Sequence, residues 1–139
     1  MTKKKTTKTW REKYNGRTAT ETKRLEVAFA GMKPGQMMLI STPAEIEEWL
    51  RSIPSGSTRT VEELRSALAQ HHAADVTCPA TTGIFLRIVS EIALEELADG
   101  RPIDQVTPFW RVVDPSSPLA SRLSCGSEWI WTTRDAEQK

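Results

Sequence analysis

The sequence has few of the residues that build catalytic and metal centres: among 139 residues there are two cysteines and two histidines. Two cysteines argue against a small secreted domain held by several disulfides, so we expect free thiols in a reducing compartment, the cytoplasm. No apolar run reaches the roughly 20 residues of a membrane span, so we expect no membrane contact. A secretory signal has an apolar segment after its basic start, and no such segment follows the basic residues here, so we expect no secretory signal.

The composition that is present, 38% hydrophobic and 27% charged, is ordinary for a globular domain. Its charge is unevenly placed. Residues 1–24 carry nine basic and two acidic side chains, a net of +7, and because the whole chain is +1 the remainder carries −6. We expect a mostly disordered basic arm over 1–24, with Trp10 and Tyr14 available for docking, and one folded domain over 25–139. The arm is suited either to binding phosphates or to keeping the protein soluble.

Hydrophobic periodicity divides the folded part into helices and short strands. The apolar run at 36–41 predicts a strand. Two stretches, 42–53 and 60–72, begin with a threonine that a glutamate follows three residues later, and this pattern predicts helix starts. A third and longer helix is expected over 82–99, capped by a threonine and ended by a glycine.

The third helix is expected to have one apolar and one charged face. The expected buried face consists of Ile84, Phe85, Ile88, Val89 and Ile92. The expected outer side consists of Arg87, Glu91, Glu95, Glu96 and Asp99.

After this helix, FWRVV at 109–113 predicts a strand, and EWIW at 128–131 a final strand or short helix. Three helices and then a hairpin-like strand pair follow the order of a winged helix-turn-helix. The expected fold class is therefore mainly α, with the short strand pair as the wing.

Four short motifs resemble the C-terminal, DNA-binding domain of the alkylguanine-DNA alkyltransferases. They are IPSG at 53–56, TV at 60–61, ATTGIF at 80–85 and PFWRVV at 108–113. Members of that family flip an alkylated guanine out of the duplex and take its alkyl group onto a cysteine. The chain is also similar to the alkyltransferase-like proteins, which keep the fold and the binding but lack the acceptor thiol. The resemblance covers roughly the last two-thirds of the chain.

The resemblance implies DNA binding without catalysis. Phe109 stands where the family has its acceptor cysteine, and Trp110 where it has the histidine that activates this cysteine. Alkyl transfer needs a thiolate and a neighbouring base, and neither aromatic side chain supplies one. We expect no enzyme activity, no cofactor and no metal, and double-stranded DNA that is alkylated or distorted as the partner.

The candidate site follows from the same alignment of motifs. Val61 replaces the tyrosine that rotates the nucleotide, and Thr81 or Thr82 replaces the arginine that fills the gap in the stack. The candidate DNA- or base-binding residues are Thr60, Val61, Thr81, Thr82, Gly83, Phe109, Trp110 and Arg111.

Three of these candidates have two interpretations. Phe109 and Trp110 are suited either to stacking on a base or to packing in the core. We expect one of the two in the core, because neighbours in a strand point to opposite faces. Arg111 is expected to tether the wing rather than to contact DNA.

Two alternatives stay open. The acidic body and the tryptophans Trp129 and Trp131 are compatible with a protein-interaction module that has lost DNA binding. The other alternative is an enzyme in which Cys78 or Cys125 takes the place of the missing acceptor, since a helix start near Cys78 would lower the pKa of its thiol.

A metal centre is not expected. His71, His72 and Cys78 lie near one another in the sequence, but their spacing matches no recognised zinc pattern.

Overall fold

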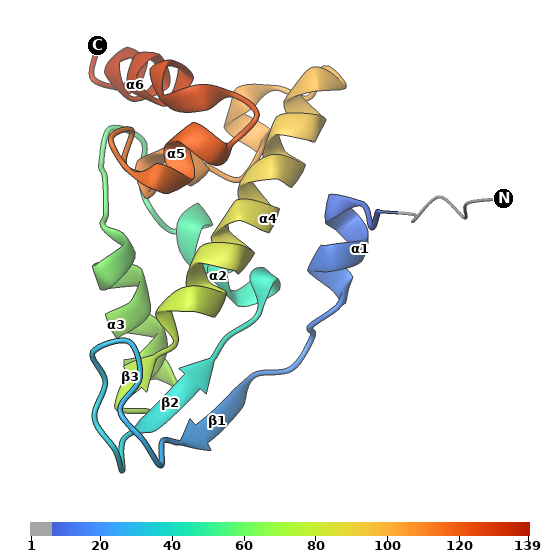
Figure 1. Cartoon of the computed structure of the whole chain (residues 1–139). Helices are drawn as coiled ribbons and strands as arrows, with labels where there is room; N and C mark the ends of the chain where they lie inside the picture. Colours follow the sequence, from blue (N-terminus) through green and yellow to red (C-terminus); the bar gives the residue numbers. More distant parts are fainter. Residues whose placement is uncertain (1–6) are drawn as a thin grey trace, which may run out of the picture.

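The computed structural model describes residues 7–139, which form a mainly helical chain with one small sheet (Figure 1). The helices are α1 (Trp10–Asn15), α2 (Pro43–Arg51), α3 (Val61–His71), α4 (Pro79–Ala98), α5 (Pro118–Arg122) and α6 (Gly126–Glu137). The strands are β1 (Glu21–Arg24), β2 (Met37–Ile40) and β3 (Val76–Thr77), and two 3-10 turns are η1 (Ile103–Gln105) and η2 (Phe109–Arg111). Among the described residues, no helix is both long and apolar enough to cross a bilayer.

The sheet has the order β1-β2-β3 and lies at the end of the molecule where α4 begins. Strand β1 is antiparallel to β2, with Thr22 opposite Leu39, and β3 is parallel to β2, with Thr77 opposite Leu39. Leu39 is fully buried in the middle of the sheet. The strand predicted at 36–41 is confirmed as β2. Its two partners were not predicted, because one is wholly exposed and the other has two residues.

The predicted starts of α2 and α3 are confirmed. The Thr42 hydroxyl oxygen accepts a hydrogen bond from the Glu45 backbone N–H at 3.1 Å. Thr60 forms a complete capping box with Glu63, because its hydroxyl oxygen accepts from the Glu63 N–H at 3.0 Å and its own N–H donates to the Glu63 carboxylate at 3.2 Å. Each bond satisfies a backbone donor that has no partner within the helix.

Helix α4 is confirmed as a long helix, but it begins three residues earlier than predicted, and its N-cap is Cys78 and not a threonine. It begins at Pro79, and Thr82 points back to donate its hydroxyl to the Cys78 carbonyl oxygen at 2.6 Å.

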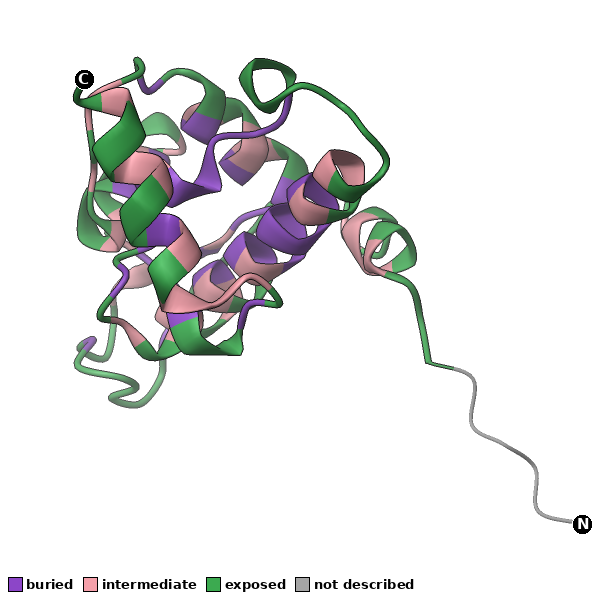
Figure 2. Ribbon diagram, turned by 90° about the horizontal axis from the view of Figure 1, so that it is seen from above, coloured by how far each residue is buried: buried purple, intermediate pink, exposed green. Residues whose placement is uncertain are grey.

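Ile84, expected inside, is 57% exposed, and Glu91, expected outside, is 5% exposed. Glu91 accepts hydrogen bonds from the Ser124 backbone N–H and hydroxyl, which satisfy its buried carboxylate. The predicted faces are therefore wrong at Ile84 and Glu91 but confirmed at the other four apolar positions, which are buried, and at Glu95 and Asp99, which are exposed. Helices α1 and α2 and the turn η2 all pack against α4. Figure 2 shows how many residues of this long helix are buried.

The strand pair expected after the third helix is wrong. Phe109–Arg111 forms the 3-10 turn η2. The EWIW segment lies within α6, which confirms the helical one of the two alternatives predicted for it. The strands of the only sheet among residues 7–139 therefore all precede α4 in the sequence, whereas the predicted strand pair would follow it. Because η2 is a tight turn and not a strand, its neighbouring side chains do not point alternately to opposite faces, as the prediction assumed.

The prediction of a mostly disordered basic arm is wrong for residues 7–24. They contain α1 and β1, and β1 continues into the hairpin with β2 across the proposed boundary at residue 24. Trp10 and Tyr14 pack against the core, in agreement with the expectation that they are available for docking. Lys3, Lys4 and Lys5 lie outside the described residues.

Candidate functional site

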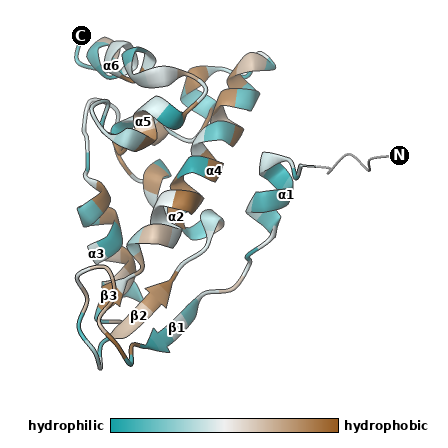
Figure 3. Ribbon diagram, viewed as in Figure 1, coloured by the Kyte–Doolittle hydropathy of each residue, from teal (hydrophilic) through white to brown (hydrophobic). Residues whose placement is uncertain are grey.

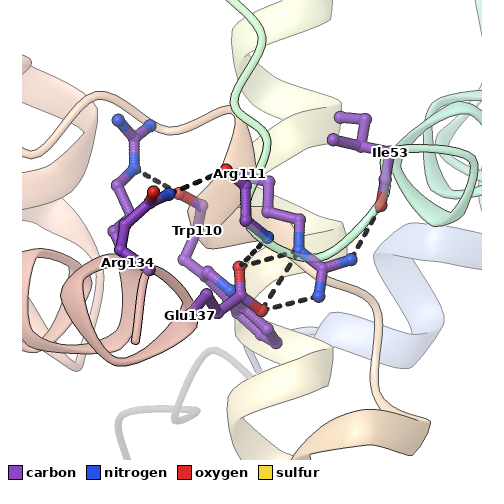
Figure 4. Close-up of polar contacts among 7 residues, drawn as sticks. Ile53, Trp110, Arg111, Arg134 and Glu137 are labelled. Carbon is purple, nitrogen blue, oxygen red and sulfur yellow. Dashed lines mark hydrogen bonds and ion pairs between the residues drawn. The ribbon is translucent and has the colours of Figure 1, made fainter.

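Two of the resembling motifs meet in the structure although they are 58 residues apart (Figure 4). Arg111 of η2 donates through Nη1 to the Ile53 carbonyl oxygen at 2.7 Å. Its Nε and Nη2 donate to the Glu137 carboxylate of α6 at 3.0 and 2.6 Å. Burial alone would raise the pKa of Glu137, but the hydrogen bonds and charge of Arg111, together with the Trp110 side chain and a hydrogen bond from the Gly56 backbone, lower the pKa below its ordinary value. Arg111 is therefore a tether, as expected, although what it holds is a turn and not a wing.

The IPSG turn is tied to the same helix. Its last residue, Gly56, has a φ of +86°, which favours glycine. The Gly56 carbonyl oxygen accepts a hydrogen bond from the Gln138 side-chain amide at 2.7 Å. The IPSG turn, η2 and the end of α6 thus form one connected unit.

A second arginine of α6 holds the other side of η2. Arg134 donates through Nε to the Trp110 carbonyl oxygen at 2.5 Å and through Nη2 to the Val113 carbonyl oxygen at 2.9 Å. Burial lowers the pKa of Arg134, although the charge of Asp114 acts in the opposite direction. These bonds satisfy two carbonyl groups that the turn leaves without backbone partners.

Phe109 and Trp110 are both in the core, with 0% and 1% of their surface exposed. Phe109 stacks on Trp129, with ring centroids 5.5 Å apart and an interplanar angle of 10°. Trp110 meets both rings edge-on. Only one of the two was expected to be buried, and the structure leaves neither ring a face for a base.

A cavity of about 470 Å³ lies next to this filled position. The start of α3 contributes Thr60 and Val61 to its lining, and α4 contributes Gly83 and Leu86. Residues of the segment 112–119 and Arg134 also line it, together with other residues around the start of α3 (Thr58, Arg59, Glu62 and Glu63). This volume is typical of sites for small organic groups. A Cβ added at Gly83 would meet no atom within 4 Å, so the glycine leaves open space at the α4 wall.

The candidate residues thus divide into two groups. Thr60, Val61 and Gly83 come together at the cavity. The others do not line it: Thr81, Thr82, Phe109, Trp110 and Arg111.

The lining also includes residues that the sequence analysis missed. Asp114 and Ser117 lie in a segment that the sequence analysis interpreted only as a turn. No motif in the sequence around Arg134 indicates a binding residue.

Neither cysteine reaches the cavity. Cys78 is 4% exposed and packs with Leu25, Met32 and Met38 beside the sheet. Cys125 is half-buried before α6, and its pKa is raised by burial and by the nearby charge of Glu91.

The histidines belong to another part of the fold. The His72 Nε2 lies 2.8 Å from Glu45 Oε2, which ties the end of α3 to the start of α2. Over residues 7–139, no group of three His, Cys, Asp or Glu side chains is placed to hold a metal ion.

We expect Cys125 to react slowly with iodoacetamide in the native protein. A raised pKa leaves less thiolate at pH 8 than an exposed cysteine has, and the thiolate is the reactive form. Time-resolved mass spectrometry of the native and urea-unfolded chain measures this, with a several-fold faster rate expected after unfolding. Equal rates in the two states would show that the thiol is available as an acceptor.

Comparison with protein-family models, curated proteins and solved structures finds no match to this chain.

Proposed function

We propose that this protein is a non-enzymatic DNA-binding protein of the alkyltransferase-like kind, and that it holds an extrahelical, alkylated nucleotide in the cavity. One observation carries the proposal. Two helix starts that the resemblance assigns to DNA binding, Thr60–Val61 and the Gly83 segment, converge on one cavity beside the tethered PFWRVV turn. In this proposal α3 and α4 act as the helix-turn-helix pair.

The lining has the chemistry of a base-binding pocket. Its partly exposed apolar members, Val61 and Leu119, offer a wall for the flat face of a base, and the nearly fully buried Leu86, Val112 and Val113 lie behind them. The exposed Asp114 carboxylate provides an acceptor for the edge of the base. No cysteine or histidine is among the lining residues, so the pocket supports binding and supplies no acceptor for an alkyl group.

The surroundings include groups of both charges. Arg59 lies at the cavity, and the start of a helix offers backbone N–H groups to a phosphate. Glu62 and Glu63 lie there too, and the Glu63 carboxylate is engaged by the Thr60 N–H. Binding is therefore expected to be modest in affinity and to depend on the nucleotide that enters the cavity.

Gly83→Leu tests the cavity directly. The new side chain enters open space, and replacing a helical glycine is expected to keep or raise the free energy of unfolding, by up to about 1 kcal/mol. Because the leucine fills the site for the base, affinity for a duplex carrying an O6-alkylated guanine should fall about tenfold, comparable with the loss of one stacking contact. Fluorescence anisotropy with damaged and undamaged duplexes measures this.

Ala98→Leu is the matched control, since Ala98 is exposed at the far end of the same helix. It should leave affinity for both duplexes unchanged. If Gly83→Leu binds the damaged duplex as the unmodified chain does, the cavity is not the site.

One observation favours a second candidate, a protein-interaction module. Trp131 is 63% exposed on α6, whereas Trp129 is partly buried and packs against the core. Large exposed aromatic side chains are enriched at protein interfaces. A chain that binds neither duplex at low salt would favour this second function.

A further inference from the structure

The basic helix α1 lies against α4, and its Trp10 ring is approached by a cation from each of these two helices. The Trp10 indole is approached by the Lys13 ammonium, 4.4 Å from the ring centroid, and by the Arg87 guanidinium, 5.4 Å from it. Arg87 reaches α5 on its other side, where its Nη2 lies 3.5 Å from the Arg122 carbonyl oxygen. We call Lys13, Arg87 and Arg122 the basic strip. Figure 3 shows how hydrophilic α1 is beside the more apolar α4.

Helix α1 is held in this place by a specific contact. The Tyr14 hydroxyl donates to Glu47 of α2 at 3.0 Å, and Thr107 donates to the other oxygen of the same carboxylate at 3.1 Å. Burial and the Glu47 charge raise the pKa of Tyr14, so the hydroxyl stays protonated as a donor at neutral pH. The position of Lys13 is thus set by the fold and is not that of a free tail.

The two carboxylates nearest to the strip in the sequence form hydrogen bonds with other groups rather than ion pairs with its cations. Glu12 is engaged by the Thr9 backbone in the α1 capping box, and Glu91 is engaged by Ser124. No residue of the strip forms an ion pair within the described part of the chain. The Arg87 Nε is buried and has no hydrogen-bond partner there. Lys13 and Arg87 therefore approach the same ring without a direct ion pair, and a bound anion would lower the repulsion between them.

The strip begins next to the cavity. Arg87 follows Gly83 of the cavity wall by four residues, about 6 Å along α4. Helix α5 contributes to both the cavity and the strip, because its Leu119 lines the cavity and its Arg122 belongs to the strip. The exposed acids Glu95 and Asp99 lie about 12 and 18 Å beyond Arg87 along the helix.

We propose that the basic strip binds the phosphate backbone of DNA next to the nucleotide that occupies the cavity. This inference rests on the proposed function and adds a second contact surface to it. Trp10 and Tyr14 act as positioning residues, because they hold the cations without contacting the phosphates. The N-terminal segment thereby contributes to binding through a docked helix.

The test uses the full chain and a duplex carrying an O6-alkylated guanine, with affinity measured by anisotropy from 50 to 200 mM KCl. Each cation that contacts a phosphate contributes about 0.9 to the slope of log K against log salt. The variant Lys13→Gln/Arg87→Gln/Arg122→Gln should therefore lose about 2.7 from that slope. Arg87→Lys keeps the charge and should retain most of it. Lys33→Gln, in the exposed loop between β1 and β2, is the matched control and should change the slope little.

The outcomes separate the two proposals. If the unmodified chain binds and the triple variant keeps the same slope and fold, the strip is overturned and the cavity proposal stands. If the unmodified chain binds no duplex at 50 mM KCl, the proposed function fails and the strip fails with it. Circular dichroism and thermal unfolding of each variant establish that the fold is kept.

Discussion

Phe109→Ala is expected to lower the free energy of unfolding by about 3–5 kcal/mol. The side chain is fully buried, packs edge-on against Trp110 and stacks on Trp129, so truncation leaves a void that these large rings cannot readily fill. Urea denaturation followed by circular dichroism measures the change. This position corresponds by resemblance to the alkyl acceptor, so the result also tells whether it is core or pocket.

Phe29→Ala is the control, because Phe29 is 46% exposed and undergoes the same change in side chain. This substitution should lower the free energy of unfolding by no more than about 1 kcal/mol, as is usual for substitutions of exposed residues. If the two substitutions cost the same, Phe109 is not the core residue described above, and its interpretation as a platform for a base returns.

Arg111→Met is expected to cost about 2–4 kcal/mol, because it leaves the Glu137 carboxylate and the Ile53 carbonyl oxygen without their donor. The side chains of the pair are 15% and 16% exposed, so water replaces only part of what is lost. Thermal unfolding at pH 7 measures the effect.

The same pair makes stability depend on pH in a defined direction. The pKa of folded Glu137 is lowered, so its contribution is present at neutral pH and is lost as pH falls through the folded pKa. Arg111→Met should remove this part of the acid sensitivity. The gap in unfolding free energy between the variant and the unmodified chain should therefore narrow from pH 7 toward pH 3.

Arg101→Met is the matched control. The Arg101–Glu96 pair has the same 2.6 Å distance, but its side chains are 45% and 25% exposed. Exposed pairs contribute about 0–1 kcal/mol, so this variant should be nearly as stable as the unmodified chain. Equal losses in the two variants would contradict the role of Arg111 as a buried tether.

The elements that could be predicted were those specified by neighbouring residues. Thr60 and Glu63 are three residues apart, and their capping box forms wherever the chain enters a helix. By contrast, β1 has four exposed residues and no apolar pattern, and it exists because β2 offers its edge. The segment 109–113 has strand-forming composition, but Pro108 and the contacts of Arg111 and Arg134 hold its first part in a turn.

The candidate site could be predicted only in part for the same reason. Thr60, Val61 and Gly83 mark helix starts that the motifs point to, and they line the cavity. Arg134 comes from a helix that the sequence did not distinguish from a strand, and it reaches the cavity through its bonds to carbonyl groups of a distant turn.

The sequence by itself determined where α2 and α3 begin, since capping and helical periodicity act over three or four residues. It also determined that positions 109 and 110 hold no thiol and no imidazole. Only the tertiary structure decided that both aromatic rings are buried, that α1 is docked beside α4, and that Arg87 lies between Trp10 and α5. The physical reason is that these features depend on contacts between residues far apart in the chain, which no local pattern encodes.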